Sequence, residues 1–301
     1  MGPLTLNSRS PLQMLRLTMT PRAPYPLQAG QMMVSQTFTW TNQWSFKPGV
    51  YEIDGEILRE GTYLTWGATD WLQVGIELGA FHRSGGFADG FIEGFHDAIE
   101  MTQAGRDRRS RNHFAVRLTH PNGTETVVTN DRSISLEDTL LFAQVTLTTE
   151  RRSWATIAAG LQIKLPTGNA QDLFDGKTAG GVYVSAAKML SREFVAYAAM
   201  GGGFYQPESF GGVALVEAQW TGMMTIEYRL TEEFSILVQN LFISGAAKKY
   251  DEFSEFSYEV TLGFKARITR YTVLEFGLIE NLIFYENSPD FGVHIGLTMI
   301  R

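Results

Sequence analysis

The sequence predicts an all-β protein that closes into a transmembrane, antiparallel, up-and-down β-barrel. In residues 214–230 the even positions are apolar or small, while Glu217, Gln219, Glu227 and Arg229 stand at odd positions. Residues 256–268 repeat this alternation. Side chains alternate faces along a strand, so each stretch predicts one long strand with an apolar face and a polar face. Soluble strands average about 5–6 residues, whereas a strand that crosses a bilayer needs about 9–11 and turns its apolar face to lipid.

Composition agrees with a membrane barrel. Charged residues make up 19% of the chain, below the ~25% of soluble proteins, and aromatic residues make up 12%, which suits interfacial girdles. The absence of cysteine excludes a disulfide framework and cysteine-based zinc or redox sites. A net charge of −7 argues against a nucleic-acid partner. The chain contains no apolar run of about 18 residues, so a spanning helix is not expected.

The N-terminal residues 1–30 are expected to be neither a long helix nor a paired strand. They hold five of the ten prolines, and proline lacks the backbone N–H that helices and ladders need. We expect residues 1–30 to form a periplasmic arm or a lumen plug, and residues 31–301 to form the barrel. A signal peptide is absent from this sequence, and we expect the precursor to carry one.

Strand patterns begin at residue 32 and continue to the C-terminus, and they predict fourteen strands, with twelve as the alternative. The expected strands are 31–44, 50–66, 70–82, 111–119, 123–130, 138–150, 153–165, 179–190, 193–204, 213–230, 233–245, 254–269, 272–285 and 290–300. Short and long connections alternate along this set. Bacterial barrels have an even strand count, short periplasmic turns and long extracellular loops. We therefore expect a bacterial outer-membrane location with both termini in the periplasm.

The last strand carries a further signal. Residues 294–301 resemble the C-terminal recognition signal of outer-membrane barrels, with Gly296 followed by bulky apolar residues, although Arg301 replaces the usual terminal aromatic residue. This resemblance implies the barrel-assembly machinery as a partner. Membrane lipid, lipopolysaccharide and small solutes are the other expected partners.

One long loop, 83–110, is expected to be extracellular or folded inward, and it contains the one helix that the sequence predicts. Phe87, Phe91, Phe95 and Ile99 recur every four residues and form an apolar stripe. The loop's polar cluster consists of Glu93, His96, Asp97 and Asp107. Glu93 and His96 share a helix face, which leaves open a small acid–base or metal site, but the histidines show no zinc-type spacing and a solvated polar face is the simpler interpretation. We predict no metal and no cofactor.

The same loop carries a family resemblance. The run Phe91-Ile92-Glu93-Gly94-Phe95-His96-Asp97, followed by Gly105-Arg106-Asp107, resembles a signature of an uncharacterised family of bacterial outer-membrane β-barrel proteins, defined as a domain of unknown function. The early run Asn7-Ser8-Arg9-Ser10-Pro11-Leu12 is similar to the start of that family. The resemblance covers most of the chain and implies location and fold, without catalytic residues.

Charged residues should point to the lumen, because a Lys or Arg facing lipid near mid-membrane costs about 2–4 kcal/mol. An acidic row on one expected strand, 50–66, is predicted to meet the arginines of the long loop and to form a charged constriction. The predicted lumen and constriction residues are Glu52, Asp54, Glu56, Glu77, Arg106, Arg108, Arg109, Arg111, Glu217, Glu227, Arg229, Glu259, Lys265 and Arg267.

These patterns predict a porin-like channel in which charged rings and the 83–110 loop set the selectivity for small solutes. One alternative is a plugged transporter of hydrophobic small molecules, in which residues 1–30 fill the barrel. A second is an outer-membrane enzyme acting on lipid or lipopolysaccharide through Glu93, His96 and Asp97. A third is a structural barrel without transport. Local motifs of serine hydrolases and phosphate-binding loops are missing, so we expect the protein not to be an enzyme.

Overall fold

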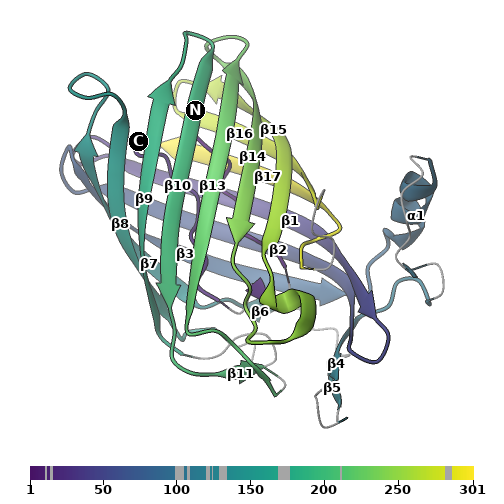
Figure 1. The fold of residues 1–301 in the computed structure, drawn as a ribbon. Coiled ribbons are helices and arrows are strands. Elements are labelled where there is room, and N and C mark those ends of the chain that lie inside the picture. Colours follow the sequence, from purple (N-terminus) through teal and green to yellow (C-terminus); the bar gives the residue numbers. More distant parts are fainter. Residues whose placement is uncertain are drawn as a thin grey trace.

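The computed structural model describes residues 1–10, 12–13, 16–98, 105–106, 109–119, 123, 125–128, 134–168, 177–210, 212–281 and 287–301. Within these residues, twelve long antiparallel strands close into a barrel (Figure 1). They are β1 (Met32–Lys47), β2 (Tyr51–Gly67), β3 (Leu72–Ser84), β7 (Thr139–Thr148), β8 (Thr156–Leu165), β9 (Ala179–Met189), β10 (Phe194–Phe204), β13 (Ala218–Arg229), β14 (Phe234–Ile243), β15 (Ser257–Thr269), β16 (Thr272–Glu280) and β17 (Phe291–Ile300).

The ring closes where β1 pairs with β17, from Met33 opposite Ile300 to Asn42 opposite Phe291. The predicted fold class is confirmed, and twelve, the alternative count, is the correct one. Along β13 the buried side chains Gln219, Thr225 and Glu227 alternate with exposed apolar ones, as the sequence pattern predicts. Among the described residues, no helix is long and apolar enough to cross a membrane.

The expected count of fourteen was wrong because two of the predicted strands are too short to cross a bilayer. Residues 111–119 and 123–130 yield β4 (Ala115–Thr119) and β5 (Glu125–Val128), which pair with each other. A crossing strand needs about 9–11 residues. β4 pairs with residues 51–54 of β2 and so extends the β1–β2 hairpin beyond the ring.

The minor elements lie in the connections. They are α1 (Asp89–Ala98), β6 (Ser135–Leu136), β11 (Ser209–Phe210), β12 (Val213–Ala214) and the 3-10 turn η3 (Asp251–Ser254). The predicted strand 213–230 is interrupted between β12 and β13, because Leu215 turns into a buried cluster.

The two ends of the barrel differ. At the end that we call the turn end, β1 begins, β17 ends, and short turns such as 190–193, 230–233 and 270–271 join the strands. At the opposite end, which we call the loop end, the strands lead into the connections 48–50, 85–138, 166–178, 205–217, 244–256 and 281–290. Figure 1 shows α1 and the β4–β5 hairpin projecting beyond the ring of strands.

Candidate functional site

The lumen is occupied by the described residues of the N-terminal stretch 1–28, which we call the lumen segment. Its first arm runs from the turn end towards the loop end. The Gly2 amide donates to Tyr197 Oη at 3.2 Å, and the Leu4 amide donates to Gln239 Oε1 at 2.9 Å. Ser8 then bonds Glu259, near the loop end of β15. Leu4 and Leu6 are almost fully buried, so this arm packs tightly against the inner wall.

The tip of the lumen segment reaches the loop end of the barrel. Gln13 donates from Nε2 to the carbonyl oxygen of Ser244 at 3.2 Å. Arg16 pairs with Glu208 at 3.2 Å, bonds the Val216 carbonyl oxygen, and stacks over the Tyr205 ring. The tip is therefore tied to the connections 205–217 and 244–256.

The second arm returns to the turn end. Tyr205 Oη donates to the Leu17 carbonyl oxygen at 2.9 Å, and Gln144 Nε2 donates to the Ala23 carbonyl oxygen at 3.0 Å. The Leu27 amide donates to Gln73 Oε1 at 3.2 Å, after which Gly30 enters the wall. The segment thus crosses the lumen twice.

Charge complementarity holds the lumen segment in place. Residues 1–30 contain three arginines and no other charged side chain. Each arginine meets a carboxylate: Arg9 pairs with Glu137 at 3.4 Å, Arg16 with Glu208, and Arg22 with Glu77. The Arg22 guanidinium also lies 3.8 Å from the centroid of the Phe142 ring. Such buried cations are stable only while they remain paired.

An irregularity in the wall supplies the partner of Arg9. β6 and β7 both pair with β3, and Glu137 and Asp138 lie between them. Both consecutive side chains reach inward: Asp138 pairs with Lys164 at 3.0 Å, and Glu137 accepts from Arg59 Nη2 at 2.6 Å as well as from Arg9. Burial alone would raise the pKa of Glu137, but the two arginines outweigh it and hold that pKa below its usual range.

A second buried network lines the wall near the first arm. His294 lies between Thr39 Oγ1, 2.8 Å from Nδ1, and Glu275 Oε1, 3.0 Å from Nε2. Lys265 Nζ pairs with Glu275 at 2.7 Å and donates to the Pro3 carbonyl oxygen at 2.7 Å. The Thr5 amide also donates to Glu275. A hydroxyl, an imidazole and a carboxylate are aligned here, but all three are buried, so we assign them to anchoring the segment.

Apolar side chains cluster at the loop end of the barrel. This mouth cluster comprises Leu12, Tyr51, Ile53, Ile57, Phe81, Phe114, Val116, Leu118, Val213, Leu215, Ala246, Ala247, Tyr250 and Phe253. It combines the tip of the lumen segment, the inner face of β2 and β4, and two loop-end connections. The Tyr51 and Phe253 rings meet edge to face at 4.8 Å. Burying many apolar groups together makes opening costly, at roughly 25 cal/mol per Å² exposed.

Four of the predicted lumen residues lie on the inner wall: Glu77, Glu227, Glu259 and Lys265 are buried and contact the lumen segment. Three others, Glu217, Arg229 and Arg267, lie at the ends of the barrel. Glu217 is exposed at the loop end, where Lys248 donates to it at 2.6 Å and holds its pKa below the usual range. Arg229 and Arg267 lie at the turn end of β13 and β15.

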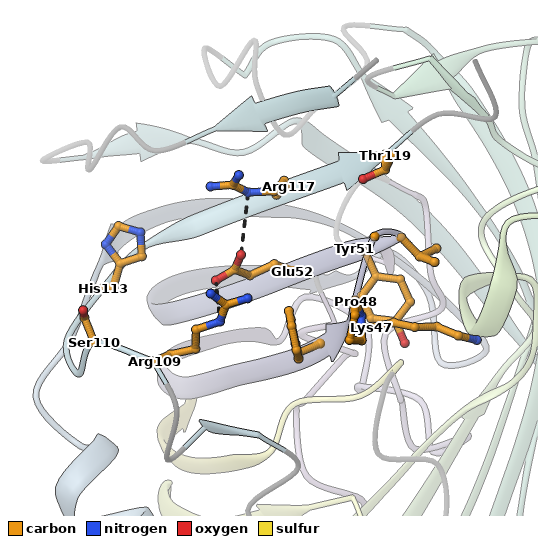
Figure 2. A pocket seen from close by; sticks show the side chains of 12 residues that line it. Lys47, Pro48, Tyr51, Glu52, Arg109, Ser110, His113, Arg117 and Thr119 are labelled. Carbon is orange, nitrogen blue, oxygen red and sulfur yellow. Dashed lines mark ion pairs between the residues drawn. The ribbon is translucent and has the colours of Figure 1, made fainter. Parts of the chain in front are cut away.

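The acidic row points away from the lumen. Glu52, Asp54 and Glu56 share the face of β2 that carries the exposed Leu58 and Trp66, opposite to the inward-facing Arg59. Glu52 lies between Arg109 and Arg117, each 3.6 Å away, in an outer pocket of about 470 Å³ at the β1–β2 tip (Figure 2). Among the described residues, the acidic row and the loop arginines therefore form no constriction in the lumen.

The long loop packs on the outside of the barrel. Arg106 is buried and pairs with Asp89 at 2.6 Å and Asp290 at 2.8 Å, and it lies over the Trp44 ring. Glu56 accepts the amides of Phe87 and Ala88 at 2.9 and 2.8 Å, just before α1 begins. The signature residue Arg106 therefore fastens the loop to the outer wall.

The loop's polar cluster is represented among the described side chains by Glu93 and Asp97. Glu93 pairs with the exposed Arg111, and Asp97 is exposed. The side chain of His96, and the residues Asp107 and Arg108, lie outside the described part of the chain. Among the described residues, no group of three or more His, Asp or Glu side chains is arranged to hold a metal ion.

Sequence reasoning missed the partners of the lumen segment. Arg9, Arg16 and Arg22 were visible as unopposed charges in a Pro-rich stretch, and that imbalance was the available signal. Lys265 and Glu275 are cross-strand neighbours, but their pairing depends on the strand register. Glu137 reaches the lumen through the irregularity between β6 and β7, which no sequence pattern predicted.

Comparison with known proteins agrees with this architecture. A family model described as "Protein of unknown function (DUF3187)" matches residues 1–300, which confirms the resemblance to a family of unknown function. The fold is similar to the COG4313 outer membrane channel from Pseudomonas putida F1, with a TM-score of 0.63 and 12% identity over 94% of this chain and 100% of that chain. At this identity the likeness shows the fold alone.

Two further solved structures match more loosely. The KdgM porin, in complex with disordered oligogalacturonate, gives a TM-score of 0.48 at 6% identity over 89% of this chain and 98% of that chain. The P. putida toluene transporter TodX gives 0.40 at 8% identity over 97% and 91%. The search of curated proteins gives no match.

Proposed function

The chain belongs to the family described as "Protein of unknown function (DUF3187)", and we propose that it is an outer-membrane channel closed by its own N-terminus. The observation that carries the proposal is the double passage of the lumen segment through the barrel. In the proposed cycle the segment leaves the lumen, wholly or in part, and a small solute passes. The similarity to a solved outer-membrane channel supports this class of function.

The contacts of the lumen segment support a movable plug. Many of its anchors are ion pairs and hydrogen bonds to the wall, and water can replace these once the lumen hydrates. An ion pair between the lumen segment and the wall breaks in the open state, so it stabilises the closed state but does not prevent opening. The charged groups of the inner wall would then set the selectivity for solutes.

Short turns typically face the periplasm and long loops the exterior. We therefore propose that the turn end, with the N- and C-termini, lies on the periplasmic side. The mouth cluster would then face the exterior, and Gly30, the hinge between the lumen segment and β1, would lie at the periplasmic rim.

Conductance in planar bilayers tests the proposal. We expect deletion of residues 2–28 to raise single-channel conductance severalfold over the full chain, because the deletion vacates the lumen. The matched control is Glu150→Gln, which removes an ion pair of similar type from an exposed turn, where Lys188 lies 2.9 Å away. If the deletion conducts no better than the full chain, the lumen segment is not the plug.

One observation favours a second candidate, a structural barrel that never opens. The inner wall carries buried ion pairs between its own residues, including Arg59 with Glu137 and Lys164 with Asp138, which can persist when the lumen segment leaves. For a structural barrel, the full chain should show no openings at any voltage, and variants that loosen the segment should also remain silent.

A further inference from the structure

A cavity of about 280 Å³ lies between the two arms of the lumen segment, towards the turn end of the barrel. Pro3 belongs to the outgoing arm, and Pro21 and Tyr25 belong to the returning arm. The opposite walls come from lumen-facing residues of the strands, including Met33, Phe142 and Val273. The cavity therefore exists only while both arms are in place.

The lining departs from the polar interior typical of water-filled barrels. Met33, Val273 and Ile300 are apolar and occupy inward-facing positions of β1, β16 and β17. Proline rings and the Tyr25 ring from the lumen segment face them. Apolar groups arranged around a void lose contacts that a ligand can restore, so such a cavity favours an apolar occupant.

The charges at the cavity's edge are already compensated. Lys265 pairs with Glu275, and Arg22 pairs with Glu77. An anionic or cationic ligand would have to break one of these pairs or remain unpaired, which is costly in a buried site. Ser35 and Thr298 share a hydrogen bond of 2.8 Å at the wall, and their hydroxyl groups offer one polar contact to a ligand.

The volume limits the size of the ligand. A dry cavity of about 150 Å³ accepts benzene. The cavity between the arms is nearly twice as large, so it has room for two fused rings or a ring with a short chain.

We propose that this cavity is a binding site for a small, uncharged, mostly apolar molecule of about two rings with one hydroxyl or carbonyl group. The inference rests on the proposed function, because it names the class of solute for the channel. Such a molecule contacts both arms at once, so its binding stabilises the docked lumen segment by mass action.

The probe for this proposal is 6-bromo-2-naphthol, soaked into crystals of the full chain, and its bromine is located by anomalous scattering. We expect a bromine peak between Tyr25 and Val273. Val273→Phe fills the cavity and should lower the affinity at least tenfold in equilibrium dialysis against amphipol-bound protein. Leu274→Phe is the matched control, because the next residue of β16 faces outward, and it should bind as the unmodified chain does.

A second cavity-filling variant, Ile300→Trp, guards against misfolding of Val273→Phe, and heat-modifiable migration on gels reports folding of each. Absence of a bromine peak in the lumen, or equal affinity of Leu274→Phe and both cavity-filling variants, would overturn the proposal. The charged analogue 2-naphthalenesulfonate should bind at least tenfold more weakly, and equal binding would refute the preference for neutral ligands. If the full chain binds the ligand but deletion of residues 2–28 does not change the conductance, only the channel proposal is contradicted. If the deletion raises the conductance but the full chain does not bind the ligand, only the cavity site is contradicted.

Discussion

The ion pair between Arg22 and Glu77 offers the sharpest test of a movable lumen segment. Glu77 belongs to the wall and Arg22 to the segment, so the pair breaks when the segment leaves. Glu77 also accepts a hydrogen bond of 2.9 Å from Thr20 Oγ1. The change Glu77→Gln keeps the shape of the side chain but leaves the Arg22 guanidinium buried without its carboxylate.

The expected magnitude follows from burial. Both side chains are largely shielded, with exposed fractions of 11% for Arg22 and 5% for Glu77. Removing one partner of a buried pair costs about 3 kcal/mol at the lower end of the measured range. At about 1.4 kcal/mol per factor of ten, the open population of the segment should rise about 10²-fold.

The assay uses the absence of cysteine from the chain. Thr18→Cys places a buried thiol on the lumen segment, and a membrane-impermeant maleimide modifies it only when the segment opens. We expect Glu77→Gln to accelerate labelling about 10²-fold in this background. The control Glu150→Gln should leave the rate unchanged within about twofold, since that pair lies in an exposed turn.

A double substitution distinguishes the ion pair from general damage. Arg22→Met combined with Glu77→Gln removes both partners and leaves no unpaired buried charge, so labelling should return towards the rate of the unmodified background. Equal labelling rates for Glu77→Gln and the background would refute the reasoning. A double variant that labels as fast as Glu77→Gln would show that the effect does not come from the ion pair.

Three further predictions follow from other parts of the structure. Arg9 of the lumen segment and Arg59 of the wall both hold the pKa of Glu137 below its usual range, and the Arg9 contribution exists only while the segment is docked. The Arg9–Glu137 pair therefore stabilises closure fully above the usual carboxyl range and loses this effect as the pH falls and Glu137 is protonated. Labelling of Thr18→Cys, normalised to the unfolded chain, should accelerate in acid, and less so in Glu137→Gln. An acid-insensitive rate would contradict this. Arg106→Ala removes a buried ion pair and should weaken the attachment of the 83–110 loop to the barrel by about 3 kcal/mol, so limited proteolysis should cleave the loop faster. Arg111→Ala, which removes an exposed pair, should not change the cleavage. Equal cleavage of the two variants would refute the fastening role of Arg106. Phe87 and Phe91 are 78% and 64% exposed next to the outward-facing Trp40 and Phe291, so we expect α1 to lie at the membrane interface. A spin label at Phe91→Cys in nanodiscs should then be more accessible to oxygen than to a water-soluble nickel reagent, with the reverse at Asp97→Cys. Water-like accessibility at both positions would contradict this location of α1.

The barrel itself was readable from the sequence because its signal is local. Alternation with period two along β13 and β15 reports which face meets lipid, and that pattern survives without knowledge of any neighbour. The strand count was harder to predict from the sequence. Residues 111–119 alternate like a wall strand, and only their pairing with residues 51–54 of β2, beyond the ring, shows that they do not cross.

The acidic row shows where the charge rule fails. Even positions of β2 carry Leu58 and Trp66, so parity alone places Glu52, Asp54 and Glu56 on the outward face. The prediction gave more weight to the cost of a charge facing lipid than to parity. That cost does not apply here, because this end of the hairpin extends past the ring and is covered by the 83–110 loop, whose amides satisfy Glu56. Interactions between segments far apart in sequence, such as Arg9 with Glu137, lay beyond any local pattern.

The lumen segment enters the wall directly through Gly30, whose amide bonds the Gly67 carbonyl oxygen at 2.8 Å. The plug is therefore a tethered ligand of its own barrel. A linked binding partner is present at an effective concentration in the millimolar range, whatever the abundance of the protein. The return of the released segment to the lumen is consequently a first-order process. A permeating solute competes for the lumen with this tethered segment, which dilution of the protein cannot remove.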